Sequence, residues 1–129
     1  MEGQQKEQMK IKLYDSELNI MEYLWRVQEA SAKEIAAEMA AQVGWSKTTT
    51  YTVLKKCVDK GAVERREPGF QCKPLISREQ VQEYETRELI DKLYGGSADR
   101  LVASLLGGQT LSGQEIDNLK RLIDRLEQG

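Results

Sequence analysis

Basic and hydroxyl side chains gather between Trp45 and Arg66, where six Lys and Arg residues stand against two acidic residues, a net charge of +4. The whole chain has a net charge of −2. Salt screens each charge beyond about 8 Å, so this local excess can neutralise phosphates even on an acidic protein. The threonine hydroxyl and methyl groups of the same segment can meet base edges in a DNA groove. The chemistry indicated is therefore nucleic-acid binding.

A helix predicted from the N-cap Ser46 to about residue 60 would present these groups on one side. At about 100° per residue, Thr50, Leu54 and Cys57 fall on one face and most of the hydroxyl and basic side chains on the other. The alternative is an ordinary solvated face of an amphipathic helix, and the neighbouring elements favour the binding role. We expect contacts with base edges from Thr48, Tyr51 and Thr52, and contacts with phosphates from Lys47, Lys55, Arg65 and Arg66.

Three helices with short connections are predicted ahead of the first strand. The first is capped by Asp15 or Ser16 and ends near residue 27; the second is opened by a capping box of Ser31 and Glu34 and closes at about residue 42; the third is capped by Ser46 and stopped by Gly61. Two extended segments follow, 62–66 and 70–73, separated by Glu67-Pro68-Gly69, which suits a type II turn. This order is typical of a winged helix-turn-helix, in which the third helix enters a DNA groove and the hairpin touches the backbone.

Residues 77–129 have a different character, because three capped helices there each carry only a narrow apolar stripe. A capping box at Ser77 opens a charged helix that reaches about Tyr94, and glycine pairs separate it from two more helices. About 50 residues with such stripes could hardly bury a core alone, so we expect a second copy of the chain to cover them. The expected dimer-interface residues are Leu101, Leu105, Ile116, Leu119, Ile123 and Leu126.

The predicted fold class is therefore mainly α with a small β-hairpin, a winged helix-turn-helix followed by a three-helix dimerisation domain. The expected boundaries are a flexible N-terminal tail at 1–10, a winged-helix DNA-binding domain at 11–76 and a helical dimerisation domain at 77–129.

The composition argues against an enzyme and against a metal protein. The chain has no His, which removes the commonest general acid and base and the usual ligand of zinc and iron sites. Cys57 and Cys72 form no CxxC pair and fall at apolar positions, so we expect buried thiols, with a thiol switch as the open alternative. Trp25 and Trp45 are expected to pack. We expect no catalytic residue, no metal and no cofactor.

Neither a secretory signal nor an apolar run of membrane-spanning length occurs in the sequence. The first ten residues, MEGQQKEQMK, are polar. The sequence therefore predicts a cytoplasmic protein with reduced thiols and no direct insertion into a membrane.

The chain contains a series of motifs in order: Leu13-Tyr-Asp-Ser-Glu-Leu-Asn-Ile-Met21, Trp25, Gly44-Trp-Ser-Lys-Thr-Thr-Thr-Tyr-Thr-Val-Leu54, Lys60-Gly61, Pro74-Leu-Ile-Ser77, Asp91-Lys-Leu-Tyr-Gly-Gly-Ser97 and Leu101-Val102. Their order and spacing resemble the penicillinase-repressor family of the BlaI/MecI type. The resemblance covers about residues 11–127.

The resemblance implies a homodimeric winged-helix repressor of β-lactam-resistance or copper-homeostasis genes, bound to a double-stranded DNA operator with a TACA/TGTA dyad. It also implies relief of repression by cleavage in the dimerisation domain, triggered by a membrane-bound sensor protease. The bond at the family's cleavage position is Ser104-Leu105 in this chain. We expect Leu101, Val102, Leu105 and Leu106 to be buried, so a protease would need local opening.

Two functions from different classes follow. The first is a homodimeric DNA-binding repressor without catalytic activity, acting on antibiotic-resistance or stress-response genes and relieved by proteolysis or another signal. The alternative is a winged-helix protein-interaction module whose basic face does not bind DNA. Palindrome-dependent and salt-sensitive DNA binding distinguishes the two.

Overall fold

The computed structural model describes residues 11–128, so the tail predicted at 1–10 lies outside the described residues. The chain divides between Thr86 and Arg87 into two compact units, and each is described by itself. The division falls inside helix α5 (Arg78–Leu93) rather than after residue 76. The first turns of α5 belong to the first unit because Val81 packs into its core.

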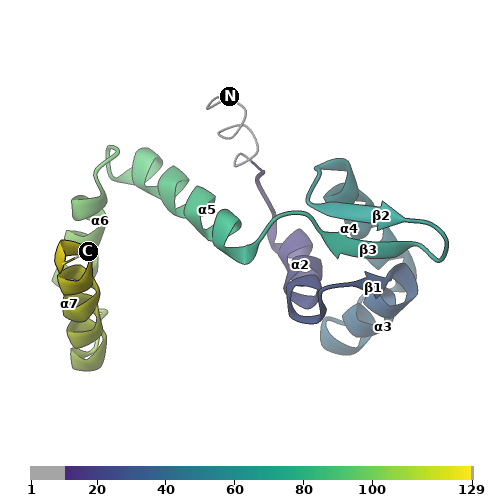
Figure 1. Ribbon diagram of the computed structural model, residues 1–129, viewed down its shortest axis with the longest axis horizontal. Coiled ribbons are helices and arrows are strands. Elements are labelled where there is room, and N and C mark those ends of the chain that lie inside the picture. Colours follow the sequence, from purple (N-terminus) through teal and green to yellow (C-terminus); the bar gives the residue numbers. More distant parts are fainter. Residues whose placement is uncertain (1–10, 129) are drawn as a thin grey trace. The chain divides into compact units, whose positions relative to one another are not determined.

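The first unit has the predicted order of three helices and a hairpin. These elements are α2 (Asp15–Val27), α3 (Ala32–Gln42), α4 (Lys47–Asp59), β2 (Val63–Arg66) and β3 (Gln71–Pro74). A further strand, β1 (Ala30–Ser31), joins the hairpin in one antiparallel sheet of order β1-β3-β2 (Figure 1). The predicted fold class, mainly helical with a small sheet in a winged-helix arrangement, is confirmed.

Helix α2 is capped by Tyr14, so the prediction of Asp15 or Ser16 as its N-cap is wrong. The Glu17 carboxylate accepts the Tyr14 backbone N–H at 2.7 Å. An acidic side chain at the third helical position can therefore satisfy the backbone N–H of the N-cap residue and so stabilise the start of the helix. Asp15 stands instead in the first turn, where its negative charge suits the helix dipole.

The caps predicted for the next two helices are confirmed. Ser31 Oγ accepts the Glu34 N–H at 3.0 Å, and Glu34 Oε1 accepts the Ser31 N–H at 2.8 Å, which completes a capping box. The Ser31 backbone N–H lowers the pKa of the Glu34 carboxyl, because it stabilises the charged form. At the start of α4, Ser46 Oγ accepts the Thr49 N–H at 3.1 Å.

Strand β1 is absent from the sequence prediction because two residues are too few to show the alternation of a strand. Ala30 of β1 and Arg65 of β2 pair with Cys72 from opposite sides, which makes β3 the central strand. Phe70, predicted to begin the second strand, has a φ of +53° and follows Gly69 with a φ of +84°. Phe70 therefore belongs to the turn, and β3 begins one residue later.

The core of the first unit lies between the three helices and the sheet. Its fully buried side chains include Ile20, Leu24 and Ile35. Trp25 and Trp45 are half-buried and pack against this core, which confirms their predicted packing role. The winged helix therefore has a hydrophobic core of its own.

Both cysteines are free and buried in this core, as predicted. Burial, and next the negative charge of Glu17, raise the pKa of Cys57 to about 12. Burial raises the pKa of Cys72 to about 11. Because the thiolate is the reactive form of cysteine, both thiols are poorly suited to redox sensing, and their surroundings support a packing role.

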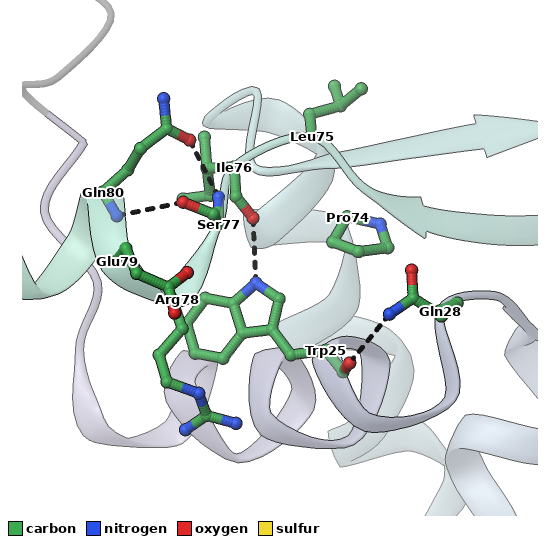
Figure 2. Close-up of a pocket in the computed structure, with 9 residues that line it drawn as sticks. All are labelled: Trp25, Gln28, Pro74, Leu75, Ile76, Ser77, Arg78, Glu79 and Gln80. Atoms are coloured by element: carbon green, nitrogen blue, oxygen red, sulfur yellow. Dashed lines mark hydrogen bonds between the residues drawn. The ribbon is translucent and has the colours of Figure 1, made fainter.

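The segment after β3 passes over the Trp25 side chain and enters α5 (Figure 2). The Trp25 indole N–H donates to the Ile76 carbonyl at 2.8 Å, and the Arg78 guanidinium lies 5.0 Å from the Trp25 ring centroid. Ser77 Oγ accepts the Gln80 N–H at 3.0 Å, and Gln80 Oε1 accepts the Ser77 N–H at 2.8 Å. These contacts hold the first turn of α5 against α2.

The second unit contains the last two predicted helices, α6 (Ala98–Gly107) and α7 (Gly113–Gln128). A capping box precedes α7: Ser112 Oγ accepts the Glu115 N–H at 3.1 Å, and Glu115 Oε1 accepts the Ser112 N–H at 2.9 Å. The structure describes every residue of α6 and α7, and none of them is buried. The apolar stripes of these helices therefore remain accessible within one chain.

Candidate nucleic-acid interface

Helix α4 buries one face and exposes the other, as its sequence predicts. Thr50 and Leu54 are fully buried. Thr48, Tyr51 and Thr52, predicted to contact bases, are all exposed. The polar face of α4 is therefore accessible to a ligand, and a major groove about 12 Å wide admits a helix.

The Thr52 side chain has a defined hydrogen-bonding state. Its hydroxyl donates to the Thr48 carbonyl, one turn earlier, at 3.0 Å. The hydroxyl hydrogen is therefore used inside the helix, which leaves the oxygen lone pairs and the methyl group of this exposed side chain for a ligand. Such a side chain can accept from the amino group of adenine or cytosine, or contact the methyl group of thymine. This restriction on the donor could not be read from the sequence.

Lys47 is the first residue of α4 and is exposed. Its Nζ lies 5.8 Å from the centroid of the Tyr51 ring, one turn along the helix. Free backbone N–H groups and the positive end of the helix dipole lie at the same end of α4. This end of the helix therefore combines a cation, an aromatic ring and a positive dipole, which suits contact with a phosphate.

Lys55 lies one turn beyond Tyr51 and pairs with Asp59 at 3.0 Å. The two side chains are 78% and 61% exposed. Exposed ion pairs contribute only about 0–1 kcal/mol, so Lys55 can exchange the Asp59 carboxylate for a phosphate at little cost.

The wing carries Arg65 and Arg66 in adjacent positions of β2, both exposed. The Arg65 guanidinium lies 4.2 Å from the centroid of the Phe70 ring and 3.3 Å from the Glu67 carboxylate. Arg66 pairs with Glu64 at 3.1 Å. Successive side chains of a strand point to opposite faces, so the two guanidinium groups start from opposite sides of the wing.

Lys60 belongs to the basic segment in sequence but pairs its charge with a buried carboxylate. Its Nζ lies 2.6 Å from Glu17 Oε1, and the Glu17 side chain is only 2% exposed. The surface charge of the segment is therefore smaller than the sequence count of +4 indicates. Glu17 was not singled out from the sequence, where an acidic residue in a first helical turn indicates only a favourable helix end.

The sequence predicts no metal site and no insertion into a membrane. Over residues 11–128 no three Asp, Glu or Cys side chains come together as a metal site. No helix in this part of the chain has the length and apolar character needed to cross a membrane.

The six predicted dimer-interface residues lie on α6 and α7 and are half-buried or exposed. Leu101, Ile116 and Leu119 are half-buried, whereas Leu105, Ile123 and Leu126 are 39%, 53% and 80% exposed. Val102 and Leu106 are exposed as well. The expected burial of Val102, Leu105 and Leu106 is therefore wrong within one chain, because this unit has too few residues to cover both helices.

The bond between Ser104 and Leu105 lies inside α6. Ser104 is exposed, and its Oγ accepts a hydrogen bond from the Tyr94 hydroxyl at 3.2 Å. Both side chains are accessible in one chain, but the backbone around the bond is helical.

Comparison with known proteins gives consistent matches. The family model described as penicillinase repressor matches residues 13–125. A penicillinase repressor of Bacillus licheniformis is 27% identical over 112 residues, which cover 85% of this chain and 88% of that protein. The methicillin resistance regulatory protein MecI of Staphylococcus aureus (strain N315) is also 27% identical, over 85% of this chain and 91% of that protein. The solution structure of the DNA-binding domain of the repressor BlaI is similar with a TM-score of 0.51 and 26% identity, over 54% of this chain and 88% of that domain.

Proposed function

Because this chain belongs to the penicillinase repressor family, we propose that it is a homodimeric transcriptional repressor that binds a palindromic DNA operator of the TACA/TGTA type. The family and the similarity of the fold to the BlaI DNA-binding domain support the general function, a DNA-binding repressor that is not an enzyme. The operator sequence, the dimer and the mechanism of relief are the specific parts of the proposal. The regulated genes are of the antibiotic-resistance or stress-response class.

The exposed face of α4 is the observation that carries the proposal. Tyr51 and Thr52 lie accessible in the middle of the helix, and Lys47 and Lys55 lie one turn to either side of Tyr51. In this arrangement the hydroxyl, methyl and aromatic groups read base edges while the flanking cations contact phosphates. The Thr52 oxygen suits the amino group of adenine or cytosine and its methyl group suits that of thymine, and a TACA half-site contains all three bases.

The cations proposed to contact phosphate predict how binding depends on salt. Each winged helix supplies four of them, namely Lys47, Lys55, Arg65 and Arg66. Two copies on a palindrome would neutralise about eight phosphates, which predicts a slope of log K against log salt of about −7 on B-DNA.

Dimerisation through α6 and α7 supports binding to two half-sites. Both helices are amphipathic and bury no residue within one chain. A second copy would cover their stripes and present two α4 helices to one duplex. Engagement of the second half-site at high effective concentration strengthens binding by about 10²–10⁴.

Relief of repression is proposed to follow cleavage at the Ser104-Leu105 bond by a membrane-bound sensor protease, or another signal that separates the subunits. Cleavage there would detach α7 from the winged helix, because α7 begins at Gly113. The exposure of Leu105 supports access to the bond in a free chain. The helical turn around it must unwind before a protease can bind it as an extended strand.

Fluorescence anisotropy with two labelled duplexes tests the proposal. One duplex carries a TACA/TGTA dyad, and the other has the same composition in scrambled order. We expect tighter binding to the dyad and a steep salt dependence on it. Equal affinity for both duplexes would refute sequence recognition, and no binding to either would favour the protein-interaction module.

A further inference from the structure

Glu17 is the only acidic residue buried among those that the structure describes, at 1% exposure. Its Oε1 accepts two hydrogen bonds, from the Tyr14 backbone N–H at 2.7 Å and from Lys60 Nζ at 2.6 Å. Lys60 Nζ also donates to the Lys12 carbonyl at 2.7 Å and lies 4.4 Å from the centroid of the Tyr14 ring. The lysine charge therefore contacts one carboxylate, one carbonyl and one aromatic face, and the Lys60 side chain is 29% exposed.

These contacts join two places that are far apart in the sequence. Glu17 and Tyr14 belong to the start of α2, whereas Lys60 is the C-cap of α4. After Lys60 the chain turns at Gly61, which has a φ of +83°, and β2 begins at Val63. Lys60 therefore stands where the proposed reading helix ends and the wing is about to begin.

A buried ion pair is weak evidence of added stability, because desolvation of both charges offsets their attraction. The geometry is demanding, however, since the buried carboxylate of Glu17 tolerates few arrangements in which it keeps both of its hydrogen-bond donors. Apolar contacts along α4 are less directional and would allow the helix to slide or rotate by small amounts. An ion pair at Lys60 fixes the C-terminal end of α4 and so removes this freedom to slide or rotate.

We propose that the Glu17–Lys60 pair positions α4 and the wing for operator recognition, so that Glu17 and Lys60 are positioning residues that do not touch DNA. The inference rests on the proposed function and extends it to side chains behind the reading face. Loss of the pair should reduce preference for the operator more than general affinity for DNA, because base contacts depend on helix placement more strictly than phosphate contacts do.

The double variant Glu17→Gln/Lys60→Met tests this inference without changing the net charge. The change Glu17→Gln keeps an oxygen that can accept the Tyr14 N–H, and the change Lys60→Met keeps most of the apolar stem of the lysine. The matched control is Asp15→Asn/Lys56→Met, which also neutralises one acid at the start of α2 and one lysine in the last turn of α4, both of them exposed. Thermal unfolding and anisotropy on the dyad and scrambled duplexes are measured for the wild type and both variants.

We expect the Glu17→Gln/Lys60→Met variant to fold and to bind the scrambled duplex like the wild type. Its preference for the dyad should fall about tenfold or more, the discrimination that a good base contact supplies, while the control keeps the wild-type preference. A folded variant with unchanged preference would refute the positioning role and leave the proposed function intact. A wild type without any preference would refute the proposed function and, with it, this inference.

Single Glu17→Gln provides the same comparison if the double variant does not fold, because it removes one charge and keeps the acceptor oxygen. A reduced dyad preference in this folded single variant would support the positioning role, and an unchanged preference would overturn it.

Discussion

Replacing Ile123 by Asp would place a carboxylate in the apolar stripe of α7. Ile123 is 53% exposed in one chain, so about half of its side chain remains for a partner to cover. No residue of α7 is buried within the chain, and the substitution therefore disturbs no core. We expect a variant that keeps its winged helix and does not dimerise.

The magnitude follows from this exposure. Full burial of an isoleucine contributes about 1.5–3 kcal/mol, so burial of the remaining half contributes about 1 kcal/mol per subunit. An unpaired charge in a desolvated interface costs about 3–5 kcal/mol more. Because a two-fold dimer contains the substitution twice, the dimer loses about 8–12 kcal/mol. Solvent access to the new carboxylate reduces this loss, but half of the lower value already raises the dimer dissociation constant about a thousandfold.

Sedimentation equilibrium at micromolar concentration measures the effect. The wild type should sediment at twice the chain mass of 14.7 kDa and the Ile123→Asp variant at that mass. Gln114→Asp is the control, because it adds the same carboxylate on the opposite side of α7. An Ile123→Asp variant that stays dimeric, or a wild type that is a folded monomer, would refute the assignment of this interface.

Lys55→Ala should weaken binding to the dyad and scrambled duplexes about equally and reduce the salt slope by about one per half-site. Thr52→Ala should instead reduce the dyad preference by about 1 kcal/mol per half-site; anisotropy titrations that give the reverse pattern would show that the two roles are exchanged. A chain that ends at Ser104 should bind the dyad about 10²–10⁴-fold more weakly than the intact chain, and equal affinity would exclude separation of the subunits as the means of relief. Because the pKa of Cys57 is raised from 9.0 to about 12 in the folded state, the native protein holds this proton more tightly than the unfolded chain. The free energy of unfolding should then fall above pH 9, by about 1.4 kcal/mol per pH unit from this group. Urea titrations between pH 8 and pH 11 follow the approach to that slope, and an equal pH dependence in Cys57→Ala would contradict its assignment to Cys57.

Signals confined to a few residues were sufficient to predict most of the helices. The capping box of Ser31 and Glu34 and the cap at Ser46 involve atoms within three residues of each other, so their spacing in the sequence already contains the geometry. Tyr14 was missed as a cap because its own side chain has no role in capping, and Glu17 supplies the hydrogen bond from inside the helix.

Features that depend on distant residues could not be predicted. The exposed face of α4, by contrast, depends only on helical periodicity, and the structure reproduces the prediction at Thr48 and Thr52. The partner of Lys60 lies 43 residues away in sequence, so nothing in the local pattern separates this half-buried, paired lysine from the exposed Lys55. Strand β1 depends in the same way on Cys72, which lies in a strand formed far later in the chain.

The central position of β3 has a consequence for the entropy of binding. A two-stranded ribbon attached by one edge alone would sample many orientations, and binding would have to freeze them. In this protein Ala30 and Arg65 hold Cys72 from both sides, so the end of the wing next to its turn moves with the connection between α2 and α3 as one body. Only the turn around Gly69 extends beyond the ladder. The wing therefore meets its ligand preorganised, and the ordering cost of binding is confined to the few residues at its tip.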